Sequence, residues 1–157
     1  MPSRRHSRSG SRSRKSQVGT RKHKGGSHLT QKSFDMIVKK MLELSILVRL
    51  YHWNTFSYAT HKATDDLHTS ISGHIDSYVE TMLGKSDGKY RINMNDFKTL
   101  SVKGVSNNSE MTTKVKQFIS EFNKFNSSLK GDYNDVLNIR DEIVGDLNKF
   151  LYLLSLK

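Results

Sequence analysis

Apolar side chains recur every three or four residues in four separate stretches of the chain. This spacing places them on one face of an α-helix. The first two stripes are Phe34, Ile37, Met41, Leu44, Val48 and Tyr51, then Leu67, Ile71, Ile75, Tyr78 and Met82. The other two are Met111, Val115, Phe118, Phe122, Phe125 and Leu129, then Val136, Ile143, Leu147, Phe150 and Leu154. The pattern predicts an all-α protein with four amphipathic helices.

The segments between the stripes differ in length. We expect a short loop within residues 55–60, a long connection over residues 89–106 and a short break at residues 130–132. The Gly84–Gly88 segment should end the second helix, a short helix is expected near residues 95–100, and Ser109 resembles an N-cap. Short, long and short connections predict a ferritin-like four-helix bundle with one long crossover.

The charge is concentrated in the first 28 residues, which hold nine Lys or Arg, seven Ser, four Gly and no acidic residue. The rest of the chain has 17 basic and 15 acidic residues, so most of the formal net charge of +11 lies in this tail. Such a composition cannot bury enough apolar surface to fold. The sequence therefore predicts a disordered basic tail over residues 1–28 and one bundle domain over residues 29–157.

The basic tail is a candidate DNA-binding segment. A flexible cationic arm neutralises phosphates and releases counterions without reading the base sequence. The alternatives are a solubilising tail or an address such as a nuclear signal. The candidate DNA-binding residues are Arg4, Arg5, Arg8, Arg12, Arg14, Lys15, Arg21, Lys22 and Lys24.

Three further features of the sequence limit the kinds of site and the cellular location that we expect. The chain has no cysteine, which excludes disulfides and thiolate metal sites. Its longest apolar run is far shorter than the roughly 20 residues of a membrane span. No apolar segment resembling a secretory signal occurs near the start. We expect an intracellular, DNA-associated protein of a nucleoid or chromatin, with a virion as the alternative location.

Five potential metal ligands lie between residues 52 and 80. Imidazole and carboxylate groups suit iron, manganese or zinc. Two pairs have i,i+4 spacing, which places each pair on one face of a helix. The candidate ligands are His52, His61, Asp65, Asp76 and Glu80.

A helix over residues 58–83 would point both pairs in the same direction, within about 20°, but separate them by roughly 16 Å along the axis. No single ion could contact both pairs of one chain, because metal–ligand bonds are only about 2 Å long. Two antiparallel copies, related by a two-fold axis near Ser70 to Gly73, would bring His61 and Asp65 of one copy to Asp76 and Glu80 of the other. Such a dimer would have two equivalent sites.

These motifs resemble the Dps family of mini-ferritins, the DNA-protecting proteins of starved cells. The resemblance covers residues 33–157 and rests on the run Tyr51-His52-Trp53-Asn54, on His61-x3-Asp65, on Asp76-x3-Glu80 with Gly84, and on the segments 141–145 and 150–154. It implies a hollow dodecameric cage that oxidises Fe²⁺ at sites between subunits. It also implies that one subunit supplies His52, His61 and Asp65, that its mate supplies Asp76 and Glu80, and that Trp53 lies beside the site.

One spacing departs from the family pattern, since fewer residues separate His52 from His61 than in the family. A shorter loop either leaves both histidines in place or turns His52 away. His68, His74 and Asp66 are not part of the family pattern and are interpreted as surface residues.

Three functions remain open. The first is a Dps-like DNA-binding ferroxidase that acts with either peroxide or oxygen. The second is an architectural protein with weak iron chemistry that compacts DNA, including a viral genome. The third is a helical protein whose basic arm binds nucleic acid or a protein partner, in which case the candidate ligands form an ordinary solvated helix face.

Overall fold

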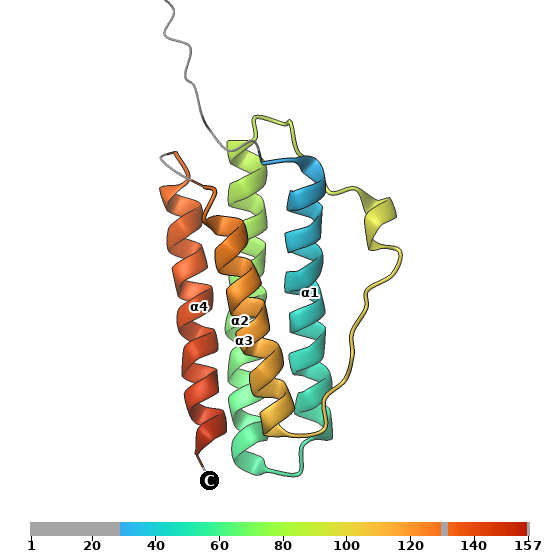
Figure 1. Ribbon diagram of the computed structural model, residues 1–157, viewed down its shortest axis with the longest axis vertical. Helices are drawn as coiled ribbons and strands as arrows, with labels where there is room; N and C mark the ends of the chain where they lie inside the picture. Colours follow the sequence, from blue (N-terminus) through green and yellow to red (C-terminus); the bar gives the residue numbers. More distant parts are fainter. Residues whose placement is uncertain (1–28, 130–131, 157) are drawn as a thin grey trace, which may run out of the picture.

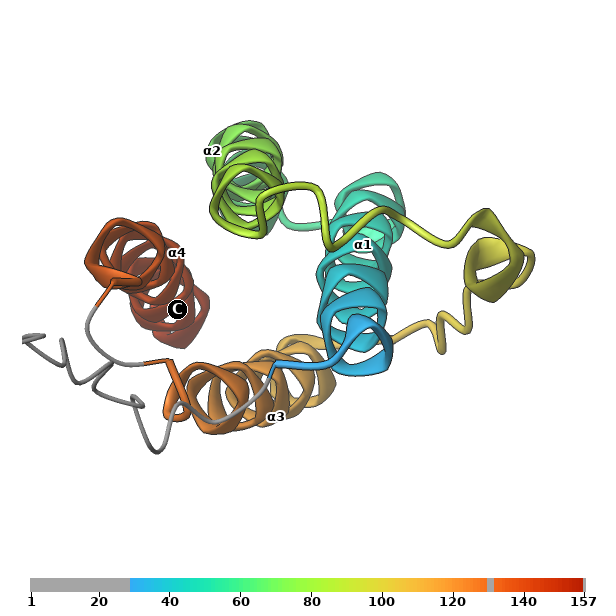
Figure 2. The ribbon, with the colours of Figure 1, turned by 90° about the horizontal axis from the view of Figure 1, so that it is seen from above.

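A computed structural model of the protein describes residues 29–129 and 132–156. The candidate DNA-binding residues 4–24 lie outside these ranges. The described residues form a four-helix bundle in which α1 neighbours α2 and α3, and α4 neighbours α2 and α3 (Figure 1, Figure 2). This confirms the predicted all-α bundle. The helices are α1 (Gln31–Asn54), α2 (Tyr58–Lys85), α3 (Asn108–Asn126) and α4 (Asn134–Ser155).

The connections have the predicted order of lengths. Residues 55–57 join α1 to α2, residues 86–107 join α2 to α3, and residues 127–133 join α3 to α4. The crossover of residues 86–107 runs back along the full length of the bundle beside α1, so α2 and α3 point in the same direction (Figure 1). It contains a short 3₁₀ helix, η1 (Met94–Phe97), slightly earlier than the predicted helix near residues 95–100.

Polar side chains set the helix starts. Thr30 and Ser33 form a capping box at α1, and the Ser57 side chain accepts a hydrogen bond from the backbone N–H of Thr60 at α2. The prediction that Ser109 caps the third helix is wrong, because Asn107 caps α3 by accepting from the N–H of Glu110. Both residues suit a cap by type, and the tertiary position of the chain selects the earlier one.

The predicted apolar stripes form the core. Every member of the first, second and fourth stripes is buried, and in the third Phe125 is only partly buried. Tyr78 is fully buried, and its hydroxyl donates a 2.8 Å hydrogen bond to Oδ1 of Asn126 at the end of α3. Asn126 in turn donates to the carbonyl of Phe122, so this polar group is satisfied within the apolar interior.

The crossover is fixed to α1 by hydrogen bonds. The Gln31 side chain donates to the carbonyl of Arg91 and accepts from its N–H, and buried Asp35 accepts from the N–H of Asn93. Further along, Glu43 accepts a 2.9 Å hydrogen bond from the N–H of Ser101. These contacts hold a segment with little helical structure against the outer side of α1.

None of the described helices combines the length and apolar character needed to cross a membrane.

Candidate metal centre on the α1–α2 face

The short α1–α2 connection brings His52 and His61 together. His52 ends the buried part of α1 and is 8% exposed, whereas His61 lies in the first turn of α2 and is exposed. Their rings stack with 3.9 Å between centroids and 25° between planes. The short connection therefore leaves the His52 and His61 rings in contact.

Each imidazole is oriented by the backbone of the other residue. Nδ1 of His52 lies 3.0 Å from the carbonyl oxygen of His61, and Nδ1 of His61 lies 3.1 Å from the carbonyl oxygen of His52. The hydroxyl of fully buried Thr64 lies 3.2 Å from Nδ1 of His52. A carbonyl can only accept, so Nδ1 must carry the proton in each ring. In the neutral rings, Nε2 then holds a lone pair that can bind a metal.

Asp65 lies one turn beyond His61 and its side chain is 46% exposed. The Arg49 guanidinium on α1 lies 3.9 Å from Oδ1 of Asp65 and donates a 2.9 Å hydrogen bond to Nδ1 of His68. The same guanidinium lies 5.9 Å from the centre of the Trp53 ring. Arg49 therefore connects a candidate ligand, a histidine outside the family pattern and the exposed tryptophan.

Sequence reasoning missed Arg49 and Thr64. The signal for Arg49 is its position, three residues before His52 and four before Trp53, which places all three side chains on neighbouring positions of one helix face. Thr64 precedes Asp65 and resembles an ordinary helix residue, so nothing in the sequence distinguishes it. Burial, followed by the Arg49 charge, lowers the pKa of His68 from its ordinary value and keeps the ring neutral.

Asp76 and Glu80 lie on the second half of α2, and both are exposed. In the described part of the chain, neither carboxylate has a hydrogen-bond or ion-pair partner within the distance limits of such contacts. Asp76 borders an open apolar groove between α1, α2 and the crossover, whose lining includes Val38, Leu42 and Val79. Asp65 also faces α1, through Arg49, so both halves of the candidate site lie on the α1 side of α2.

Because α2 is one uninterrupted helix, the His61–Asp65 and Asp76–Glu80 pairs stay roughly 16 Å apart along its axis. Within residues 29–129 and 132–156 of one chain, no three His, Asp or Glu side chains come close enough to hold one metal ion. The stretch between the pairs is small and open, since Ser72 and Gly73 are exposed and no atom lies within 4 Å of a Cβ built on Gly73. The candidate ligands of one described chain therefore form two separate groups.

Trp53 is 67% exposed, and two other exposed aromatic residues, Phe56 and Tyr58, follow it within five positions of the sequence. All three lie at or beside the turn that joins α1 to α2.

His74 and Asp66, which are not part of the Dps pattern, have partners elsewhere. Lys62 pairs with Asp66 at 2.8 Å, and His74 lies 3.2–3.4 Å from carboxylates of α4.

Comparison with known proteins gives one match. No curated protein and no solved structure matches the chain. A family of unknown function, DUF5856, matches residues 52–154, from the first candidate ligand to the end of the α4 core stripe and over more than half of the 157 residues. The chain belongs to this family of unknown function, DUF5856.

Proposed function

We propose that the protein is a Dps-like, DNA-binding ferroxidase that oxidises Fe²⁺ at sites shared between two copies of the chain. One copy supplies His52, His61 and Asp65, and the other supplies Asp76 and Glu80. The observation that carries the proposal is the stacked histidine pair, in which each Nδ1 is hydrogen-bonded to a carbonyl and each Nε2 has no hydrogen-bond partner among residues 29–129 and 132–156. Histidines with this second interaction are typical of metal sites, where it fixes the ring and its tautomer.

Iron is the substrate in this proposal. Imidazole nitrogen suits Fe²⁺, whereas carboxylate oxygen favours the harder Fe³⁺. The two stacked rings hold their in-plane lone pairs in separate, nearly parallel planes, which suits two neighbouring ions better than chelation of one ion. Each Fe²⁺ would lose one electron to peroxide or oxygen. Trp53 would lie beside the metals, and Asp65 would exchange its 3.9 Å contact with Arg49 for a bond to iron.

The two-copy arrangement is supported by the distance between the two ligand pairs of one chain. His61–Asp65 and Asp76–Glu80 face the same side of one helix but are too far apart to share an ion. Antiparallel α2 helices around Ser72 and Gly73 would complete two sites per dimer. Six such dimers in a hollow dodecamer would match the Dps-like assembly that the sequence motifs imply.

Nucleic-acid binding forms the second part of the proposal. The nine cations of residues 4–24 would neutralise DNA phosphates without sequence preference, and many tails on one particle would raise the effective affinity. A protein with this tail but without iron chemistry would remain an architectural DNA-compacting protein.

Co-assembly of two inactive chains tests the shared site. The His61→Ala/Asp65→Ala chain and the Asp76→Ala/Glu80→Ala chain should each lack rapid Fe²⁺ oxidation. Mixed dimers should recover activity, because one of their two sites would contain all its ligands. A Lys62→Ala/Asp66→Ala chain is the matched control, since it alters the same helix outside the site and should keep full activity. Mixed particles as inactive as their components would refute the shared site.

A further inference from the structure

The two sides of the bundle carry opposite charge. Residues 31–57 and 89–128, which comprise α1, the crossover from residue 89 onward and α3, contain 11 basic and five acidic residues, a net charge of +6. Residues 58–88 and 132–156, which comprise α2 and α4, contain four basic and ten acidic residues, a net charge of −6. Figure 2 shows α1, the crossover and α3 on one side of the bundle and α2 and α4 on the other.

The carboxylates on the basic side are already used by the chain itself. Glu43 accepts from the N–H of Ser101, and Glu110 accepts from the N–H of Ser106 at the start of α3. Buried Asp35 holds the crossover. These acidic groups stabilise backbone segments and neutralise no lysine in the described residues.

Glu121 is the exception, because it pairs with Lys40 at 2.6 Å. Hydrogen bonding from Lys40 keeps the pKa of the Glu121 carboxyl below its ordinary value, so the pair stays charged. Two adjoining hollows border this pair, one lined also by Lys103 and Lys114 and the other by Lys124. Three lysines therefore surround one ion pair, and the centre of this side keeps a net positive charge.

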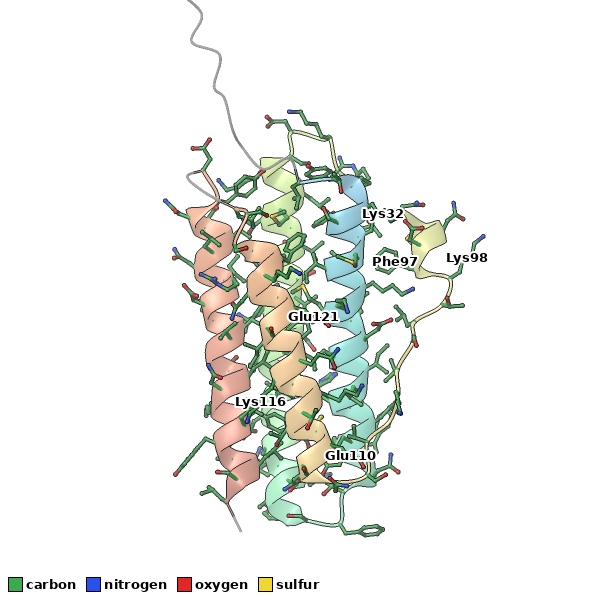
Figure 3. The ribbon with its side chains drawn as sticks, in the orientation of Figure 1. Lys32, Phe97, Lys98, Glu110, Lys116 and Glu121 are labelled. Carbon is green, nitrogen blue, oxygen red and sulfur yellow. The ribbon has the colours of Figure 1, made fainter. Side chains whose placement is uncertain are left out.

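Further exposed lysines extend the basic side over all three elements. Figure 3 shows Lys32 on α1, Lys98 on the crossover and Lys116 on α3. None of them has a carboxylate partner within residues 29–129 and 132–156. On the acidic side three of the four cations are paired, since Lys62 pairs with Asp66, Lys85 with Asp135 and Arg140 with Asp141.

We propose that the α1–crossover–α3 side of the bundle is a second binding surface for the phosphate backbone of duplex DNA. The inference rests on the DNA-binding part of the proposed function. DNA binding by the tail and DNA binding by the bundle can be refuted separately. The 24 residues of α1 span roughly 36 Å, which matches the length of about one turn of duplex. Exposed lysines neutralise phosphates through counterion release and give affinity without sequence readout.

Continuity with the tail favours DNA over an acidic protein. The chain enters the bundle at Leu29, which lines the same hollow as Lys124 and Lys40. The nine tail cations therefore join the body at the basic side. A ligand that meets both sets of cations must carry anions at regular intervals over a long distance, as duplex DNA does.

The test uses full-length chains in a two-by-two design. One change replaces the nine tail cations of residues 4–24 with glutamine, and the other is Lys103→Gln/Lys124→Gln. The matched control is Lys62→Gln/Lys149→Gln, which removes two exposed lysines from the acidic side. Binding of a short duplex is measured by fluorescence anisotropy over a range of salt concentrations. Helical content and particle mass are compared to confirm that folding and assembly are unchanged.

We expect the Lys103→Gln/Lys124→Gln pair to reduce the log–log salt slope by about 0.9 for each phosphate that is no longer neutralised, in both tail backgrounds. The tail-neutral chain should retain measurable binding at low salt, and the control pair should change the slope much less. Equal effects of the two pairs, or no binding by the tail-neutral chain, would overturn the inference. Undiminished binding by the tail-neutral chain would instead refute the tail and leave the body surface as the DNA site.

Discussion

The two halves of the proposed site, one at the α1–α2 turn and one on the second half of α2, differ in how far one chain orients their side chains. His52 and His61 are stacked, hydrogen-bonded to each other's backbone and supported by Thr64. Asp76 and Glu80 are exposed at the edge of an open groove. In the proposed site, the nitrogen half would be oriented before any partner or metal arrives, whereas the oxygen half would gain its surroundings only on assembly. Preorganised ligands lower the cost of ordering on binding, and exposed carboxylates can be changed without disturbing the fold.

The largest expected effect is on iron oxidation by the Asp76→Ala/Glu80→Ala chain. The rate should fall on the order of 100-fold, because the oxygen ligands are removed from both sites of every dimer. The free energy of unfolding should stay nearly unchanged, since both side chains are exposed. Stopped-flow oxidation and denaturant unfolding measure the two quantities. A large decrease in stability alongside the slower oxidation would show that these carboxylates also hold the fold.

The His52→Ala chain, unlike the carboxylate variant, should lose stability as well as activity. It should lose activity and also about 2 kcal/mol of stability, because a buried ring, its stacking interaction and its hydrogen bonds disappear. Denaturant unfolding gives this value, and Asp76→Ala is the control. If both variants unfold at the same denaturant concentration, the contacts of His52 do not stabilise the folded chain more than those of Asp76, and the comparison between the two halves of the site fails.

Thr64→Val tests whether the Thr64 hydroxyl helps to orient the His52 ring. The exchange keeps the shape of the side chain but removes the hydroxyl that lies 3.2 Å from Nδ1 of His52. We expect Fe²⁺ affinity to fall about 10-fold, the lower range for removing a group that supports a metal ligand. Titration with Fe²⁺ under anaerobic conditions measures the change. Thr69→Val, on the same helix but exposed, should leave the affinity unaltered.

The smallest expected effect concerns pH. Burial and Arg49 lower the pKa of His68, so the unfolded chain binds this proton at higher pH than the folded chain. The free energy of unfolding should therefore decline as pH falls below about 6.5 and level off below the folded-state pKa. His68→Gln should flatten this part of the profile while keeping an acceptor for Arg49. A profile identical to that of the unaltered chain would assign the pH dependence to other groups.

The fold follows closely from the sequence, because four apolar stripes of period 3.6 have to face one another. The same signal predicts the second helix from Tyr58, and the structure confirms it. Local choices follow less directly, as the cap at Asn107 in place of Ser109 shows. The position of His52 depends on the path of a three-residue turn, and the roles of Arg49 and Thr64 depend on contacts between helices. Periodicity within one helix contains none of this information.

The three-residue turn between α1 and α2 also has a consequence for how the chain folds. Short connections cost little entropy to close, and contacts between residues near in sequence form quickly. His52 and His61 are nine positions apart, whereas α3 must wait for residues 86–107 to cross the bundle. We expect the α1–α2 hairpin to acquire amide-exchange protection before α3 and α4 dock. The histidine pair would then exist early, while the chain is still assembling its core.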